Sequence, residues 1–317
     1  MTASARASAP ASIGNVGVGF DVLGQAFDAV RDEVVAHKEE RTGVRLGQVS
    51  GLMTRLPEDP MRNTALRAAQ AVLKAVNAPF GVRLDVIKGV PISAGMGGSA
   101  ASAVAAAAAV NALLDKPFST PDLLAFALEG ERASADPPPW DNVMASLLGG
   151  LVIAAQLDPA LVKPMPVPKG VSAILFHPDA KTETQAARDV LKPETPLNTA
   201  VEHARRLGAF TLGCAMSDLD LIRAGLDDIL IEPQRAFLLP EMCAVKAAAL
   251  EANALGCSFS GSGPSIFAWA SDEDADAVQK AMADAFNTAG RGTRVYRAPL
   301  ESAGVRLEPL EEQEACA

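Results

Sequence analysis

Two periods of apolar residues in the first third of the chain predict a strand flanked by two helices. Residues 80–88 alternate apolar and polar side chains, which is typical of a half-buried strand. Residues 63–76 place apolar side chains at helical spacing, and residues 100–114 are dominated by alanine without a helix-breaking residue. The apolar positions are Val82, Leu84 and Val86 in the strand, and Leu66, Ala69, Leu73 and Val76 in the first helix.

The strand and the second helix are joined by a glycine-rich segment, residues 91–102, with the sequence Pro-Ile-Ser-Ala-Gly-Met-Gly-Gly-Ser-Ala-Ala-Ser. Its glycines let an anion approach the backbone amides, and the helix that follows offers unpaired N–H groups. The Ser99 hydroxyl can bind a phosphate or a metal bridging two phosphates. No lysine follows the last glycine, so a Walker loop is excluded. The segment predicts a phosphate site; the local alternative is a glycine-rich turn before a tightly packed helix.

The remaining pattern predicts an α+β protein of two domains. The first half adds an extended segment at 4–13, strands at 32–39, 43–49 and 151–155, and helices that begin at Thr120 and Asp141. The second half reads β-α-β-β-α-β, the split pattern of a ferredoxin-like layer, apart from helices inserted up to about residue 226. Its strands are expected at 172–176, 257–260, 265–269 and 293–297, and its main helices at 240–255 and 272–288. Four prolines in 159–169 place the boundary there, giving domains 1–158 and 159–317.

Composition narrows the possible partners of the chain. Its 317 residues are 49% hydrophobic, which is enough for two well-filled cores. The net charge of −10 and the lack of a basic tract argue against nucleic acid as a partner. No apolar run reaches the length of a membrane span and no signal peptide opens the chain, so we expect no membrane partner and a cytoplasmic protein. The cysteines, at 214, 243, 257 and 316, have neither metal-site spacing nor the density of a disulfide scaffold.

Three stretches in register resemble the GHMP kinases, a superfamily named for galactokinase, homoserine kinase, mevalonate kinase and phosphomevalonate kinase. They are residues 10–21 (Pro-Ala-Ser-Ile-Gly-Asn-Val-Gly-Val-Gly-Phe-Asp), residues 91–102, and residues 256–264 (Gly-Cys-Ser-Phe-Ser-Gly-Ser-Gly-Pro). The first stretch is similar to the homoserine kinase pattern Pro-Ala-Ser-x-x-Asn-x-Gly-x-Gly-Phe-Asp. Further matches are Asp141-Asn-Val143, Thr184-x-x-x-Arg188 and Glu232-Pro-x-Arg235.

The resemblance implies ATP-dependent phosphorylation of the side-chain hydroxyl of L-homoserine, on the branch leading to threonine, with magnesium as the metal. It also implies the GHMP kinase fold, in which an N-terminal ATP-binding domain of the ribosomal S5 domain 2 type precedes a ferredoxin-like C-terminal domain. A homodimer is expected because the family tends that way.

The same resemblance assigns roles to individual residues. Those expected at ATP are Asn63, Pro91, Ala94, Gly95, Met96, Gly97, Gly98, Ser99 and Ala100, with Ser99 and Glu131 as magnesium ligands. Those expected at homoserine are Asn15, Asp21, Asp141, Arg188, Arg235, Gly261 and Ser262. The expected catalytic residues are Ser99, Glu131, Asp141 and Thr184, with Thr184 near the transferred phosphate.

These assignments agree with the chemistry of the residues. An amino-acid substrate needs an anion for its ammonium group, which Asp21 or Asp141 can supply. It needs cations for its carboxylate, and an arginine fork matches a carboxylate in a bidentate way. Phosphoryl transfer asks mostly for positioning and charge neutralisation. Each residue also has a local alternative. Asn63 and Asp141 can cap helices, Glu131 can be a solvated charge, Arg235 a surface ion pair, and residues 261–264 a hairpin turn.

Two departures from the family pattern leave other functions open. Homoserine kinases usually have Gly-Leu-Gly-Ser-Ser, where this chain has Gly95-Met-Gly-Gly-Ser99. The family also places a histidine two residues before Asp141, where this chain has Pro139 in a run of three prolines. Proline has no donor, so a hydrogen bond from that histidine to the acceptor is lost. We predict an active kinase with an altered or weakened acceptor site. The alternatives are a GHMP kinase for another small carboxylate-bearing alcohol and a catalytically silent ligand sensor.

Overall fold

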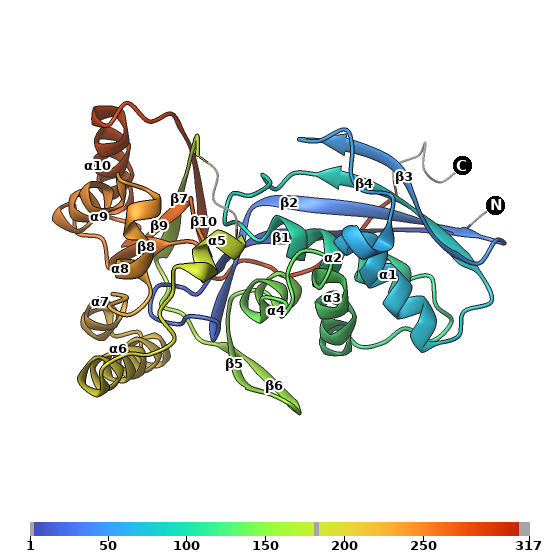
Figure 1. Cartoon of the computed structure of the whole chain (residues 1–317), viewed down its shortest axis with the longest axis horizontal. Coiled ribbons are helices and arrows are strands. Elements are labelled where there is room, and N and C mark those ends of the chain that lie inside the picture. The colour runs from blue at the N-terminus through green and yellow to red at the C-terminus, as the bar shows by residue number, and fades with distance from the viewer. Residues whose placement is uncertain (1–2, 181–183, 311–317) are drawn as a thin grey trace.

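The chain folds around two sheets that lie at opposite ends of an elongated molecule (Figure 1). The computed structural model describes residues 3–180 and 184–310, and among these it describes every side chain except those of residues 184–186. None of the helices in the described part combines the length and the apolar character that a bilayer crossing requires.

The larger sheet contains seven strands among the described residues, and its path runs β11-β1-β2-β4-β3, with β5 paired to β2 and β6 to β5. All pairs are antiparallel except β3 with β4. The strands are β1 (Ser4–Gly14), β2 (Leu23–Glu39), β3 (Gly43–Gly51), β4 (Gly81–Lys88), β5 (Leu151–Leu157), β6 (Ala160–Met165) and β11 (Arg306–Glu308). One face carries the helices α1 (Thr64–Ala75), α2 (Gly98–Asn111), α3 (Leu123–Glu131) and α4 (Trp140–Leu148), as Figure 1 shows. Two short 3-10 helices, η1 (Pro60–Arg62) and η2 (Thr120–Asp122), precede α1 and α3.

Helix α2 is the central helix of this half, because it is buried on every side. All residues from Ala100 to Asn111 are buried, and the helix contacts α1, α3, α4, β1 and β2. Alanine combines the highest helix propensity with a side chain small enough for neighbouring backbones to come close. The start of α2, which follows the glycine-rich segment, is therefore held rigidly in the molecule.

The second sheet has the strand order β10-β7-β9-β8 and is antiparallel throughout. With α9 and α10 it confirms the β-α-β-β-α-β pattern of a ferredoxin-like layer. Its elements are β7 (Val171–Pro178), α9 (Met242–Glu251), β8 (Gly256–Phe259), β9 (Ile266–Ser271), α10 (Ala275–Thr288) and β10 (Thr293–Pro299). Inserted between β7 and α9 are α5 (Thr184–Asp189), α6 (Leu197–Met216), α7 (Leu219–Gly225), α8 (Glu232–Arg235) and η3 (Ala236–Leu238). A second core lies under this sheet, where the rings of Phe176 and Phe286 stack at 5.6 Å.

The strands of the larger sheet extend beyond the predicted ranges. Strand β2 begins at Leu23, nine residues before the predicted start at residue 32. Its first part pairs with β1 after a register shift between Pro10 and Ala11, a bulge that bends the ribbon. The predicted boundary at residues 158 and 159 falls in the turn between β5 and β6, and β6 pairs with β5 in the larger sheet.

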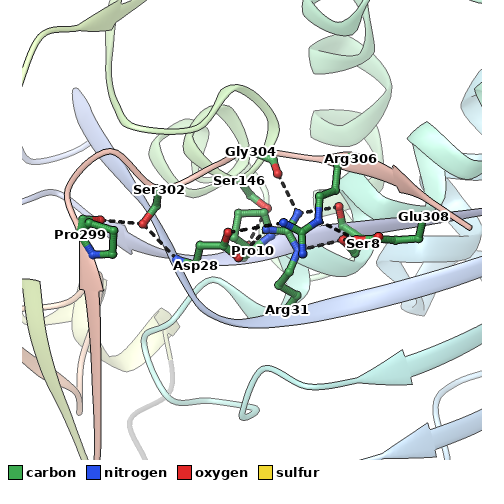
Figure 2. A network of polar contacts seen from close by, with 10 residues as sticks. All are labelled: Ser8, Pro10, Asp28, Arg31, Ser146, Pro299, Ser302, Gly304, Arg306 and Glu308. Carbon is green, nitrogen blue, oxygen red and sulfur yellow. Dashed lines mark hydrogen bonds and ion pairs between the residues drawn. The ribbon is translucent and has the colours of Figure 1, made fainter.

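The end of the described chain also returns to the larger sheet, along β1 (Figure 2). Arg31 of β2 fastens it there: its Nη2 donates to the carbonyl of Gly304 at 2.7 Å, and its Nε donates to Ser8 Oγ at 2.8 Å. Ser8 Oγ in turn donates to Glu308 Oε1 at 2.5 Å. The two halves of the molecule are therefore joined by two crossings of the chain.

Candidate active site

A cavity of about 350 Å³ lies between the two halves of the molecule and is lined by residues from both. Almost every residue that the resemblance assigned to a site lines it. From the first half these are Asn15, Asp21, Asn63, Pro91, Ala94, Gly95, Met96, Gly97, Gly98, Ser99, Glu131 and Asp141, and from the second half Arg188, Arg235, Gly261 and Ser262. Ala100 is buried in α2 and does not line the cavity. The Thr184 side chain lies outside the described part of the chain.

The glycine-rich segment lines the cavity, and three of its carbonyls are bonded within the protein. The carbonyl of Gly95 accepts from Ser260 Oγ at 2.6 Å, and that of Met96 accepts from the Ser12 amide at 3.0 Å. The carbonyl of Gly98 accepts from Lys88 Nζ at 2.9 Å. No described side chain caps the start of α2. The N–H groups of its first turn are therefore available to an anion, as the sequence predicts.

Gly97, at the N-cap of α2, is held in a conformation that other residues rarely adopt, with φ of 65°. A Cβ there would lie 2.0 Å from Ser12 Oγ and 3.0 Å from Asn142 Oδ1. The close approach of strand β1 and helix α4 therefore requires glycine at this position.

Replacing Gly97 by alanine is expected to lower the free energy of unfolding by about 1–3 kcal/mol, because the left-handed backbone and the clash with Ser12 are both unfavourable. Denaturant unfolding followed by circular dichroism measures this. The matched control is Gly98→Ala, where the nearest atoms to a new Cβ are 3.3 Å away and α2 already has helical geometry. Equal stability of the two variants would contradict the role given to Gly97.

A buried ion pair under the segment was missed by the sequence analysis. Lys88 Nζ pairs with Asp32 and also donates to Ser102 Oγ at 2.9 Å; Lys88 is 3% exposed and Asp32 is fully buried. Asp32 Oδ1 accepts from the amides of Gly89 and Val90, both at 3.0 Å. A buried pair is tolerated only when its remaining polar atoms are bonded, as here. The pair ties the end of β4 to the first turn of α2. The sequence feature that could have indicated this pair is Lys88, a lysine at the end of the predicted strand 80–88.

Glu131 and Ser99 form a compact set of oxygen atoms at the base of the cavity. Ser99 Oγ donates to Glu131 Oε1 at 2.5 Å. Glu131 is buried, and its Oε2 has no partner among the described residues. Burial raises the pKa of Glu131 to about 7, although the Ser99 hydrogen bond and the charge of Lys88 oppose the shift. A carboxylate with an unpartnered oxygen beside a hydroxyl is a donor set that suits magnesium, which takes few protein oxygens. The interpretation of Glu131 as a solvated charge is wrong.

Asp141 lies at the start of α4 with both oxygens held by backbone amides. Its Oδ2 accepts from the Asn15 amide and its Oδ1 from the Asn142 amide, both at 2.9 Å. Burial, and then the charge of Asp21, raise the pKa of Asp141 to about 6, while the two amides oppose the shift. The N-cap of α4 is Pro139, so Asp141 does not serve as the helix cap.

Two arginines supply positive charge on the opposite side of the cavity. Arg188 pairs with Asp21 through both carboxylate oxygens, at 3.1 and 3.2 Å. Arg235 is 4% exposed, and its Nε donates to the carbonyl of Ala187 at 2.8 Å. Its guanidinium carbon lies 5.2 Å from the centre of the Phe20 ring, and no described carboxylate lies within ion-pair distance. Burial, and then the charge of Arg188, lower the pKa of Arg235. The interpretation of Arg235 as a surface ion pair is therefore wrong, and the site favours an anion.

Asn63 serves as a helix cap and also lines the cavity. Its Oδ1 accepts from the amides of Ala65 and Leu66 at 3.1 and 3.2 Å, and its Nδ2 donates to the carbonyl of Pro57 at 2.7 Å. Only one N–H of the amide is left for a ligand. Asn63 therefore caps α1, as its local alternative in the sequence predicted. Its neighbours in the cavity lining include Leu56, Pro57, Arg62 and Thr64, which no sequence motif indicates.

Comparisons with known proteins agree with this geometry. The family model described as GHMP kinases N terminal domain matches residues 63–150, and the one described as GHMP kinases C terminal matches residues 209–288. The homoserine kinase of Xylella fastidiosa (strain M12) is 43% identical over 304 residues, which cover 96% of this chain and 94% of that protein. The homoserine kinase of Chlorobaculum tepidum is 38% identical over 312 residues, covering 94% and 96%.

Comparison with solved structures leads to the same family. The structure of homoserine kinase from Cytophaga hutchinsonii matches with a TM-score of 0.93 at 38% identity, covering 97% of this chain and 98% of that one. The L. major mevalonate kinase matches with a TM-score of 0.67 at 14% identity, covering 96% and 97%, which shows a shared fold alone. The resemblance inferred from the three motifs is confirmed, and so is the predicted fold class. The chain belongs to the homoserine kinase family of the GHMP kinases.

Proposed function

We propose that this protein transfers the γ-phosphoryl group of ATP to the side-chain hydroxyl of L-homoserine. The observation that carries the proposal is the composition of one cavity. An uncapped helix start and the Ser99–Glu131 pair lie on one side of it, and Arg188 and Arg235 lie on the other. The first side suits a nucleotide triphosphate and the second suits a carboxylate-bearing acceptor.

The triphosphate is held by the amides at the start of α2, whose positions are fixed by the Lys88–Asp32 pair below. Ser99 and Glu131 would hold magnesium, which neutralises charge on the phosphates when bound. The raised pKa of Glu131 means that its charged form is unfavourable without a nearby cation. Metal binding and loss of the Glu131 proton are therefore coupled.

The acceptor is oriented by charge. Arg235 has no carboxylate partner among the described residues, so it is poised to bind the carboxylate of homoserine together with Arg188. When homoserine binds, Asp21 pairs in part with the ammonium group of the substrate and correspondingly less with Arg188. Asp141, fixed by two amides, lies where it can accept a hydrogen bond from the hydroxyl. With a pKa of about 6 it is largely ionised at neutral pH, and it can accept the hydroxyl proton as the substrate oxygen bonds to the γ-phosphorus and the bond from that phosphorus to the leaving ADP breaks.

Pro139 lines the cavity next to Asp141 and offers no hydrogen-bond donor. The acceptor therefore has one donor fewer than the family pattern provides, and we propose that this weakens its binding without removing activity. The identity of the relatives supports a kinase for homoserine over a silent sensor or a kinase for another alcohol.

A panel of acceptors tests the proposal through ADP release with ATP and magnesium. L-Homoserine is expected to give turnover, and mevalonate and galactose are not. Two analogues test the charge recognition: γ-hydroxybutyrate lacks the ammonium group and aminopropanol lacks the carboxylate. Each is expected to lower kcat/KM by about 10²-fold or more: aminopropanol leaves the buried Arg235 without a carboxylate to pair with, and γ-hydroxybutyrate loses the ion pair between Asp21 and the ammonium group. Turnover with another acceptor in preference to homoserine, or with none, would contradict the proposal.

A further inference from the structure

Helix α8, which carries Arg235, has only four residues and is held in place by side chains around it. A helix of one turn has no stability of its own in water, so its position depends on contacts with other elements. The carboxylate of Asp228 makes the first of these contacts. Its Oδ1 accepts from the amides of Leu230 and Ile231 at 2.8 and 2.9 Å, and its Oδ2 accepts from the amide of Glu232 at 2.8 Å. The chain therefore enters α8 along a fixed path.

Glu232, the first residue of α8, binds two other elements through its side chain. Its Oε1 accepts from Lys246 Nζ of α9 at 2.5 Å, and its Oε2 accepts from Ser258 Oγ of β8 at 2.6 Å. Glu232 is 9% exposed and Ser258 is 2% exposed, so the carboxylate is shielded from water. None of these three residues is part of the cavity lining. From outside the cavity, the Glu232 carboxylate thus fastens α8 to α9 and β8, which lie beside it in Figure 1.

The other end of α8 is bonded to α5 and to the segment that follows α5. Lys192 lies in that segment, and its amide donates to Gln234 Oε1 at 2.8 Å. Arg235 Nε donates to the carbonyl of Ala187, the residue before Arg188, at 2.8 Å. Through these contacts the position of α8 affects both guanidinium groups that line the cavity.

The buried ion pair of Glu232 and Lys246 is explained better by geometry than by stability. Charged groups lose their hydration when they are buried, so apolar residues of similar volume often stabilise a fold equally well or better. Lys246 also has a second carboxylate within reach, because its Nζ donates to Asp227 Oδ1 at 2.8 Å. Neutralisation of the lysine therefore does not depend on Glu232 alone. What Glu232 adds is the link from Lys246 and Ser258 to α8.

We propose that Glu232 is a positioning residue for the acceptor: its carboxylate holds α8 against α9 and β8 and thereby aims Arg235 at the substrate carboxylate. This proposal rests on the function proposed above. Its effect falls on the acceptor, because α8 carries Arg235, whereas the glycine-rich segment and the Ser99–Glu131 pair belong to the first half of the molecule.

Glu232→Ala removes both contacts of the carboxylate and tests the proposal. It is expected to raise the KM for L-homoserine by about 10–100-fold with a smaller change in kcat, because a displacement of about 1 Å in a binding group is enough for an effect of this size. The KM for ATP should stay nearly unchanged, which separates positioning from a general loss of structure. Glu232→Gln should stay close to the parent protein, since its carbonyl can accept from Lys246 and its amide can donate to Ser258 Oγ.

Asp227→Ala is the matched control, because Asp227 pairs with the same Lys246 and otherwise with Arg206 of α6. This variant should keep the parent KM for L-homoserine, whatever its effect on the free energy of unfolding. Ser258→Ala removes only the contact of Glu232 with β8 and should raise the KM for L-homoserine to a smaller extent. It provides the test if Glu232→Ala does not fold.

The proposal would be overturned by equal rises in the two KM values, by a KM for L-homoserine that Glu232→Ala and Ser258→Ala both leave unchanged, or by a Glu232→Gln variant as impaired as Glu232→Ala. A crystal structure of the ligand-free alanine variant tests the geometry without the reaction. Arg235 Nε is expected to lie away from the Ala187 carbonyl, and an unmoved Arg235 would overturn the proposal for any acceptor. Absence of turnover with L-homoserine in the parent protein would instead reject the proposed function, while the crystal structure would still decide the role of Glu232.

Discussion

Replacing Glu131 by glutamine is expected to lower kcat by about 10²–10³-fold while leaving the fold intact, because the amide keeps the shape but removes the charge opposite the metal and phosphates. The concentration of magnesium that gives half-maximal rate should rise as well. Stability should not fall. Burial raises the pKa of Glu131 in the folded protein from its ordinary value of 4.5 to about 7, so the charged carboxylate destabilises the metal-free protein increasingly as the pH rises from 4.5 and fully above pH 7. The glutamine variant removes that contribution, and thermal unfolding without magnesium should show an equal or higher Tm above pH 7.

Glu129→Gln is the matched control for this variant. Glu129 stands two residues earlier on α3, its side chain is 45% exposed, and it pairs with Arg67 outside the cavity. An exposed pair of this kind contributes little, so both rate and stability should stay close to the parent protein. A Glu131→Gln variant that keeps the parent rate and magnesium dependence would refute the assignment of Glu131 as a metal ligand.

Replacing Arg235 by methionine is expected to lower kcat/KM for L-homoserine by about 10²–10³-fold, with the KM for ATP nearly unchanged. The guanidinium is buried, and its loss would leave the substrate carboxylate desolvated with only Arg188 to pair with. Steady-state kinetics with each substrate varied in turn separates the two effects. Arg235→Lys should fall between the parent and the methionine variant, because an ammonium group keeps the charge but loses the planar fork.

Arg223→Met provides the control for Arg235→Met. Arg223 on α7 also donates to a backbone carbonyl, that of Ala254 at 3.0 Å, but does not line the cavity. The Arg223→Met substitution should therefore alter neither the KM for ATP nor the KM for L-homoserine. If Arg235→Met raised the KM for ATP as much as that for homoserine, the defect would be general, and Arg235 would not be specific to the acceptor.

Most of the residues predicted for the site line one cavity, and the glycine-rich segment among them has a distinctive local sequence. The order strand, glycine segment, helix around Gly97 favours a phosphate site no more than a plain glycine-rich turn before a packed helix, and the structure contains these elements in the expected order. Glu131, Asp141 and Arg235 were different. Their local sequences favoured a helix cap, a solvated charge or a surface ion pair, and only the joint match of three stretches to one family indicated a role in the site. Their burial, which gives Glu131 and Asp141 their raised pKa values, depends on packing between distant segments and cannot be derived from spacing.

The features that were missed depend on pairing with another strand or side chain that their own local sequence does not indicate. Lys88 and Asp32 are 56 positions apart in the chain, and neither has a local pattern that indicates a buried partner. Strand β6 lies in a proline-rich stretch that suggests a linker, yet it pairs along β5. Strand β11 has only three residues, too few for a period to be detected. In each case the partner strand or side chain, and not the local sequence, decides the structure.

The return of β11 to β1 has a consequence for how the protein is made. Strand β1 precedes the whole second sheet in the chain, while β11, which covers the outer edge of β1, follows it and is therefore translated later. Until β11 has been translated, that edge exposes unpaired backbone groups on which other chains can assemble. The larger sheet thus acquires β11 only after the second sheet has been synthesised, and cutting the gene between the two halves would deprive the larger sheet of this strand.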